Sequence, residues 1–126
     1  MTDRRIITTD QAAAAAGPYS QGISANNLVF VSGQLPIKLD GVMPEGIEAQ
    51  TRQSLANVQA VLKASGSSPE LVLKTTVFLK NMDDFSAMNA IYAEVFGASL
   101  PARSTIEVAR LPRNALVEIE CIACIK

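Results

Sequence analysis

Residues 71–108 read LVLKTTVFLKNMDDFSAMNAIYAEVFGASLPARSTIEV, and the pattern of apolar residues changes twice along them. Apolar and polar residues alternate over 71–79, as in a strand with one buried face. We expect that face to carry Leu71, Leu73, Val77 and Leu79. Helical spacing then begins near Asp83 or Asp84 and stops at Gly97. The apolar stripe of this helix is Phe85, Met88, Ile91, Tyr92 and Val95. A second strand is predicted over 102–108. This stretch is therefore predicted to fold as strand, helix and strand.

The segment before this unit carries a second helical pattern, over 47–62. Its apolar stripe recurs every three or four residues and consists of Ile47, Thr51, Leu55, Val58 and Leu62. Nearer the N-terminus, 4–8 and 28–32 are predicted to be short strands. The segment 38–46 is predicted to be a loop or hairpin, with Asp40-Gly41 as its turn.

The last strand is expected over 116–125, after a turn at 111–114. The predicted order is three strands, a helix, a strand, a helix and two strands, in a single domain over 1–126. Two helices can cover only one face of such a sheet. The other face needs cover that this chain does not supply, so we expect the protein to form an oligomer.

Charge and composition exclude several classes of function. Lys and Arg number 11 against 12 Asp and Glu, a net charge of −1, which argues against nucleic-acid binding through a general basic field. The chain contains no histidine, which excludes Ser-His and Cys-His nucleophilic arrangements and histidine-ligated metals. The sequence also contains no Gly-rich phosphate loop and no cluster of metal ligands.

The two cysteines, Cys121 and Cys124, are three positions apart in the predicted last strand. Side chains at that spacing point to opposite faces of a strand, which argues against a redox pair. Two free thiols without a targeting segment suggest a reducing compartment, and we expect the cytoplasm. No apolar stretch is long enough to span a membrane.

Arg103 is the first candidate for a binding residue. It shares a strand face with Thr105 and Glu107 and follows Pro101-Ala102, so it can present a guanidinium group at the end of the sheet. A guanidinium group binds a carboxylate or phosphate through two parallel hydrogen bonds. The alternative is an ion pair with one of the glutamates Glu107, Glu118 and Glu120.

Glu118 and Glu120 share one face of the last strand. The turn before that strand can bring this face beside Arg103 and Thr105. Two carboxylates there can serve acid–base chemistry, and one of them can orient a water molecule. The alternative is a solvated edge or a partner for an arginine.

Three further positions carry both a functional and a structural interpretation. Tyr19, in the turn 17–21, can close over a ligand or fill an apolar gap. Gly33, after Ser32 at a strand end, allows close approach of a ligand or marks a β-bulge. Asn89, beside the apolar stripe of the second helix, is either a buried hydrogen-bonding group or a surface residue.

These segments, in this order, resemble the RidA/YjgF family of reactive-intermediate deaminases. The segments that carry the resemblance are Gly17–Gln21, Val31–Pro36, Lys74–Leu79, Met88–Tyr92, Pro101–Pro112 and Glu118–Glu120. The resemblance covers about residues 6–123, and its Pro-Ala-Arg-Ser stretch is highly specific for the family.

The resemblance implies a chorismate-mutase-like α+β fold: a six-stranded, mostly antiparallel sheet with two helices on one face. It also implies a homotrimer with a central barrel and with sites between subunits. The implied activity is hydrolysis of 2-imino acids, such as 2-iminobutanoate and 2-iminopropanoate, to 2-keto acids and ammonia. No cofactor or metal is implied. The implied compartment is the cytoplasm, or the mitochondrial matrix for a eukaryotic source.

The resemblance also assigns roles to single residues. Arg103 matches the arginine that binds the substrate carboxylate, and Glu118 matches the carboxylate associated with the attacking water. The remaining matches lie around the substrate: Tyr19, Ser32, Gly33, Asn89 and Thr105. Many members have cysteine where this chain has Thr105. A hydroxyl or backbone contact would survive that change, whereas a role for a thiol would not.

Other classes of function compete with this interpretation. A trimeric binding module that senses 2-keto acids without turnover would also use Arg103, so only turnover of an imine separates the two. Translation inhibition and ribonuclease activity have been ascribed to relatives, but the net charge of −1 gives them little support. Chorismate mutase activity would rest on analogy of fold alone.

Overall fold

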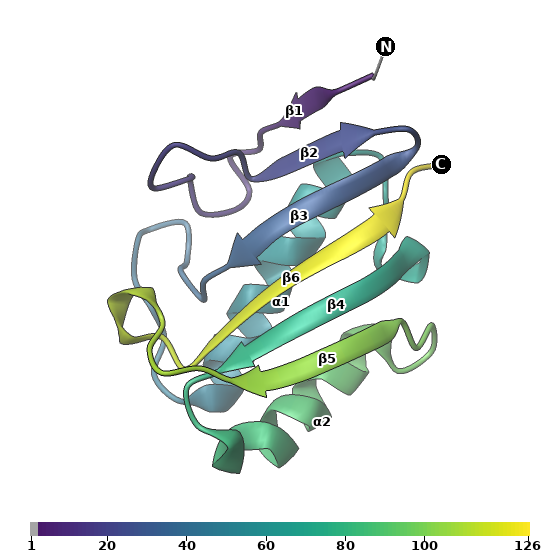
Figure 1. Ribbon diagram of the computed structural model, residues 1–126. Coiled ribbons are helices and arrows are strands. Elements are labelled where there is room, and N and C mark those ends of the chain that lie inside the picture. The colour runs from purple at the N-terminus through teal and green to yellow at the C-terminus, as the bar shows by residue number, and fades with distance from the viewer. Residues whose placement is uncertain (1–2) are drawn as a thin grey trace.

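A computed structural model describes residues 3–126 and places two helices against one face of a six-stranded sheet (Figure 1). The strands are β1 (Arg5–Ile7), β2 (Gly22–Ala25), β3 (Leu28–Gln34), β4 (Val72–Leu79), β5 (Ala102–Glu107) and β6 (Val117–Cys124). The helices are α1 (Ile47–Ala64) and α2 (Phe85–Phe96). The predicted α+β class, the helices and the strand–helix–strand unit β4–α2–β5 are confirmed.

The order of strands across the sheet is β1-β2-β3-β6-β4-β5. Every neighbouring pair is antiparallel except β4 and β5, which are parallel. A parallel pair needs a crossover connection, which α2 provides. The sheet is therefore mostly antiparallel, as predicted, and β4 lies between β5 and β6.

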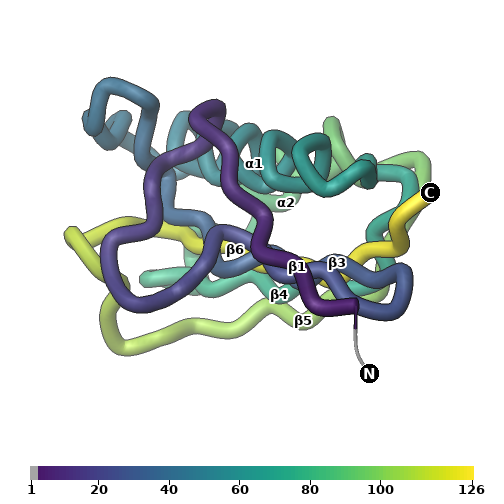
Figure 2. The backbone as a smooth tube through the Cα atoms, turned by 90° about the horizontal axis from the view of Figure 1, so that it is seen from above, coloured from purple at the N-terminus to yellow at the C-terminus, as the bar shows by residue number. Residues whose placement is uncertain are grey.

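The hydrophobic core lies between the sheet and the two helices. The sheet forms one layer and the helices form the other (Figure 2). Its fully buried members include Leu55, Val58 and Leu62 from α1 and Met88 and Phe96 from α2. Helical spacing puts such residues on one side of each helix, and that side packs on the sheet.

The opposite face of the sheet carries no helix among residues 3–126. Phe30 pairs with Ile122 and Phe78 pairs with Ile106 on this open face. Phe30 and Ile106 are 45% and 44% exposed, which is high for large apolar side chains of a sheet. The predicted uncovered face is confirmed, and its apolar character is typical of a surface that another chain covers.

The prediction for the N-terminal strands was wrong in one part. It missed β2, whose sequence Gly-Ile-Ser-Ala is short and poor in β-branched residues. The turn Asn26-Asn27, with φ of 52° and 64°, reverses the chain so that β2 pairs with β3. Residues 38–46 form a turn without a strand, in which the Lys38 amide donates to the Val42 carbonyl.

The predicted buried face of β4 was also wrong in part. A bulge in its pairing with β6 falls between Val72 and Lys74 and interrupts the alternation. Leu73 is therefore 49% exposed, while Val77 and Leu79 are fully buried. Leu71 lies before the strand, in a 3₁₀ turn over Pro69–Leu71.

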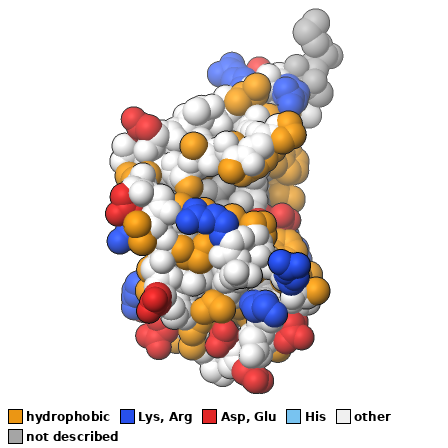
Figure 3. Space-filling view, turned by 90° about the vertical axis from the view of Figure 1, so that its left-hand side faces the viewer, with side chains coloured by type: hydrophobic (Ala, Val, Ile, Leu, Met, Phe, Trp, Pro, Cys, Tyr) orange, Lys and Arg blue, Asp and Glu red, His pale blue; other side chains and the backbone are white. Residues whose placement is uncertain are grey.

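One end of the molecule carries the loops that follow β1 and β3 and the turn that precedes β6 (Figure 1). Lys and Arg side chains on this end lie in separate places among acidic and hydrophobic side chains (Figure 3). This mixed surface matches the net charge of −1. The first of the two pockets described below opens at this end.

Candidate active site

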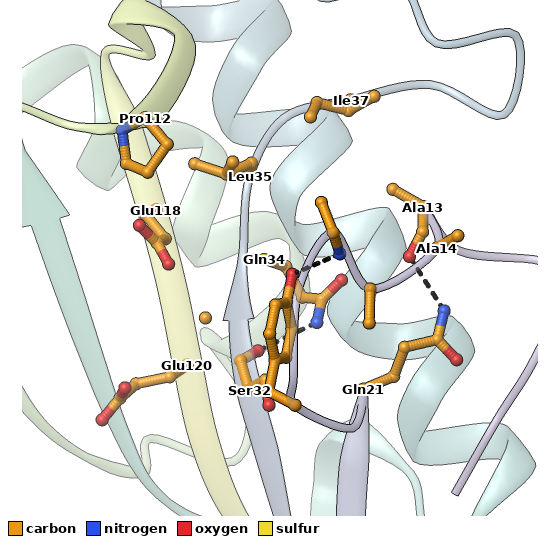
Figure 4. Close-up of a pocket in the computed structure, with 14 residues that line it drawn as sticks. Ala13, Ala14, Gln21, Ser32, Gln34, Leu35, Ile37, Pro112, Glu118 and Glu120 are labelled. Atoms are coloured by element: carbon orange, nitrogen blue, oxygen red, sulfur yellow. Dashed lines mark hydrogen bonds between the residues drawn. The ribbon is translucent and has the colours of Figure 1, made fainter.

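The predicted site residues fall into two groups in different pockets. Tyr19, Ser32, Gly33 and Glu118 line a pocket of about 430 Å³, in which Glu118 and Glu120 project from β6 (Figure 4). Asn89 and Arg103 line a second pocket, of about 410 Å³, between α2 and β5. Thr105 lies two residues after Arg103 on the same face of β5. A single chain therefore does not bring all seven residues together.

The expectation that Glu118 and Glu120 lie beside Arg103 and Thr105 was wrong. In the sheet order, β4 separates β5 from β6. Arg103 pairs with Thr75, which is buried under the helices, whereas Glu118 pairs with Phe78 on the open face. The two charged groups thus lie on opposite faces of the sheet, because neighbouring residues along β4 alternate between its faces.

The Glu118 carboxylate packs directly against the backbone of Gly33. A Cβ atom at Gly33 would lie 2.9 Å from Cδ of Glu118 and 3.2 Å from its Cγ, and closer still to a carboxylate oxygen. Only glycine leaves this space free. The pairing of β3 with β6 also shifts between Val31 and Gln34, so the predicted bulge is present as well.

The environment of Glu118 disfavours its ionised form. Burial raises the pKa of the Glu118 carboxyl, and the nearby charge of Glu120 raises that pKa further. Both carboxylates lie on the same side of β6 and line the pocket (Figure 4). A carboxylate with a raised pKa is a stronger base near neutral pH, so this pocket can accept a proton from a bound water.

Hydrogen bonds from two polar residues hold the loop that carries Tyr19. The buried Gln21 amide donates to the carbonyls of Thr9 and Ala13 at 3.1 and 2.8 Å and accepts from the Thr9 amide at 2.7 Å. The Ser32 hydroxyl donates to the Ser20 carbonyl at 2.5 Å. Ser32 thus supports the loop through its side chain.

The Tyr19 ring is 52% exposed at the edge of the pocket. Its hydroxyl accepts a hydrogen bond from the Ala16 amide at 3.2 Å, which closes the turn on itself. Within the described chain the Tyr19 ring is therefore not packed in an apolar gap. Sequence reasoning missed Gln21 as the residue that holds this loop, although it ends the Gly17–Gln21 segment.

Three side chains of α2 hold Arg103 in the second pocket. Its Nη1 atom donates to Oδ1 of Asn89 at 2.7 Å. Its Cζ atom lies 4.6 Å from the ring centroid of Tyr92 and 5.5 Å from that of Phe85. Asn89 is therefore a partly buried hydrogen-bonding group, the first of its two interpretations. Sequence reasoning placed Tyr92 and Phe85 in the apolar stripe and missed their contact with Arg103.

The alternative for Arg103, an ion pair with a glutamate, does not occur in the described chain. Among residues 3–126 the salt bridges are Arg5 with Asp3 and Arg52 with Glu94. No carboxylate of the described chain neutralises Arg103, so its guanidinium group keeps its charge and donors for an anion that enters the pocket.

Thr105 has a buried hydroxyl without a hydrogen-bond partner in the described part of the chain. Thr105 pairs with Val77, whose side chain is fully buried under the helices, so the hydroxyl lies on the same face as Arg103. A buried hydroxyl is usually hydrogen-bonded, so the Thr105 hydroxyl departs from the usual pattern.

The cysteines do not form a reactive pair. Both are free, and Cys121 is buried while Cys124 is partly exposed, as expected for opposite faces of β6. Burial raises the pKa of the Cys121 thiol to about 12, which leaves it protonated and unreactive.

No group of three or more His, Cys, Asp or Glu in residues 3–126 is arranged to hold a metal ion. None of the helices in this range is long and apolar enough to cross a membrane.

Comparison with known proteins identifies the family. A family model described as Endoribonuclease L-PSP matches residues 9–125. The 2-iminobutanoate/2-iminopropanoate deaminase of Escherichia coli K12 is 46% identical over 123 residues, which cover 94% of this chain and 96% of that protein. Reactive Intermediate Deaminase A, chloroplastic, of Arabidopsis thaliana is 50% identical over 122 residues, 95% of this chain and 65% of that one.

A solved structure agrees with these relatives. The crystal structure of the YjgF gene product of Escherichia coli superimposes with a TM-score of 0.92 and 44% sequence identity, over 97% of this chain and 99% of that one. The match extends across both pockets, because all the residues that line them fall within the range 9–125 that the family model covers. The fold, the matched length and the level of identity together show that the chain belongs to the RidA/YjgF family.

Proposed function

We propose that this protein hydrolyses reactive 2-imino acids, such as 2-iminobutanoate and 2-iminopropanoate, to 2-keto acids and ammonia. The observation that carries the proposal is Arg103, a partly buried guanidinium group held by α2 with no carboxylate partner among residues 3–126. Such a group suits the carboxylate that every 2-imino acid carries. The name and 46% identity of the Escherichia coli deaminase support the same substrate class.

The complete site is proposed to form between subunits of a homotrimer. One subunit would contribute Arg103, Asn89 and Thr105, and the next would contribute Glu118, Gly33 and Tyr19. Two features support this assembly: the two groups lie on opposite faces within one chain, and the open face of the sheet is apolar.

The reaction needs little chemistry from the protein, because the carbon of a protonated imine is already electrophilic. Arg103 would hold the substrate carboxylate through two parallel hydrogen bonds and so orient that carbon. Glu118 would accept a proton from water as its oxygen bonds to the carbon, giving a carbinolamine. Glu118 would then return its proton to the nitrogen, the carbon–nitrogen bond would break with its electron pair leaving on ammonia, and the hydroxyl oxygen would lose its proton as it forms the carbonyl. No cofactor takes part in this scheme.

A competition assay tests the proposal. An amino-acid oxidase generates the imino acid in solution, semicarbazide traps it, and the protein competes with the trap. We expect the wild type to suppress trapping and Arg103→Ala to lose that suppression. Arg52→Ala serves as the matched control, because Arg52 pairs with Glu94 on the helix surface, outside both pockets. Trapping that proceeds unchanged beside the folded wild type would contradict the proposal.

A binding module for 2-keto acids is the second candidate, because the same unpaired Arg103 would hold their carboxylate. Binding of pyruvate without any imine turnover would favour it.

The description of the family model as an endoribonuclease gains no support from the mixed charges in Figure 3. The free thiols Cys121 and Cys124 support a reducing compartment, and we propose the cytoplasm.

A further inference from the structure

We propose that Tyr92 is a positioning residue for Arg103: its buried ring fixes the plane of the guanidinium group so that the free donors face the pocket. The inference rests on the proposed function, in which Arg103 binds the substrate carboxylate. Nothing in that scheme uses Tyr92, which the sequence pattern places simply among the apolar residues of α2.

The ring of Tyr92 is itself held in place. The side chain is 7% exposed, and its hydroxyl shares a hydrogen bond of 2.7 Å with the hydroxyl of the fully buried Thr75. The ring centroid of Phe96 lies 4.8 Å from that of Tyr92, with 47° between the ring planes. A ring fixed at its hydroxyl and against a second ring cannot turn away from Arg103 without breaking these contacts.

The guanidinium group rests on this ring and on two neighbours from the same helix. Its Cζ atom lies 4.6 Å from the ring centroid of Tyr92, the shorter of its two aromatic contacts. Phe85, Asn89 and Tyr92 are four and three residues apart, so they share one face of α2. The hydrogen bond to Asn89 fixes rotation within the plane, while the rings fix the plane itself.

This arrangement holds a cation without neutralising it. A glutamate partner would orient Arg103 equally well, but it would occupy two donors and compete with the substrate carboxylate. The face of an aromatic ring attracts the cation through its quadrupole and leaves the N–H groups free. Of the donors on Arg103, only Nη1 is bound within the described chain, by Asn89.

The chemistry of Tyr92 supports a permanent role as a neutral ring. Burial raises the pKa of its hydroxyl, against smaller opposing effects of the Thr75 hydrogen bond and the Arg103 charge. The phenol therefore stays protonated across the physiological pH range, and the contact with Arg103 does not change with pH there.

The first test reads the position of Arg103 directly and needs neither turnover nor ligand. In NMR spectra of the intact protein, the ring current of Tyr92 should displace the Nε–Hε signal of Arg103, assigned by its loss in Arg103→Lys. The displacement should persist in Tyr92→Phe and disappear in Tyr92→Leu and Tyr92→Met. An Arg103 signal in the folded wild type at the same shift as in urea-unfolded protein would overturn the proposal, whether or not the variants fold.

The second test measures binding and catalysis, with pyruvate as the probe. Tyr92→Leu should raise the Kd for pyruvate and the KM for the imine by about tenfold, a size between those of an exposed and a fully desolvated cation–π contact. The effect on kcat should be much smaller, because the chemical step lies elsewhere. Tyr92→Phe and Thr75→Val lose the hydroxyl contact but keep the ring, and should stay within about twofold of wild type.

A matched control separates positioning from general destabilisation. Met88→Ala removes a fully buried side chain from the core side of α2 and should lower stability without changing the Kd for pyruvate. Unchanged pyruvate binding in folded Tyr92→Leu would overturn the proposal. If the wild type hydrolyses no imine, but Tyr92→Leu still weakens pyruvate binding and shifts the Arg103 signal, the proposed function fails and the positioning role stands.

Discussion

The two charged residues proposed to act on one substrate are held in opposite ways. Arg103 rests on aromatic rings and an amide, which preserve its charge and orient its donors. Glu118 is partly buried against Gly33 and beside the like charge of Glu120, and both effects work against its ionised form. One pocket thus keeps a cation ready for a carboxylate, and the other keeps a carboxylate ready to take up a proton.

The largest effect is expected from removing the base while leaving the cation intact. Glu118→Gln should lower kcat by about 100-fold or more, because a positioned general base contributes that much. Its Kd for pyruvate should stay close to wild type, since Arg103 lies in the other group. Competition assays and calorimetry measure the two quantities, and full activity in Glu118→Gln would remove the role of Glu118 as base.

Mixing two inactive variants tests whether the two pockets meet between subunits. Arg103→Ala and Glu118→Gln are co-expressed, so that the proposed homotrimer would assemble from both variants. At random assembly about one quarter of the interfaces would join an intact Arg103 to an intact Glu118, so about a quarter of wild-type activity should return. Each variant alone is the control. A mixture no more active than its components, in trimers shown to be mixed, would place the site within one chain.

The steric link between Gly33 and Glu118 predicts a strongly non-additive pair of changes. Gly33→Ala should displace the carboxylate and lower kcat by about tenfold or more, as a small misplacement of a catalytic group can. In a Glu118→Ala background there is no carboxylate to displace, so the same change should add little. Equal effects of Gly33→Ala in both backgrounds would mean that Gly33 acts independently of Glu118.

The smallest effect concerns stability and pH. A carboxyl whose pKa is raised by folding favours the folded state at low pH, and this contribution is lost as pH rises through the folded pKa. Glu118→Gln should therefore have a higher Tm than wild type at pH 7, with the difference shrinking toward pH 4. Glu70→Gln provides the opposite control, because hydrogen bonds lower the pKa of Glu70. A Tm difference that is constant with pH would show that ionisation of Glu118 costs no stability.

Local patterns predicted most elements of the fold. The apolar stripes of α1 and α2 depend on a spacing of 3.6 residues, and the helices occur where that spacing occurs. Alternation predicted β5 and β6 and the shared face of Arg103 and Thr105. It failed at β4, where the bulge after Val72 exposes Leu73, because a bulge arises from pairing with another strand.

For the candidate site, too, some features follow from the sequence and others only from the tertiary structure. The sequence by itself determined which residues are candidates for the site, because residue type, strand face and resemblance to the family are properties of short segments. Only the tertiary structure decided that β4 separates Arg103 from Glu118, that Gly33 makes room for a carboxylate, and that Tyr92 lies under a guanidinium group. Each of these features depends on contacts between residues distant in the chain, which the pattern of apolar residues in a short segment does not encode.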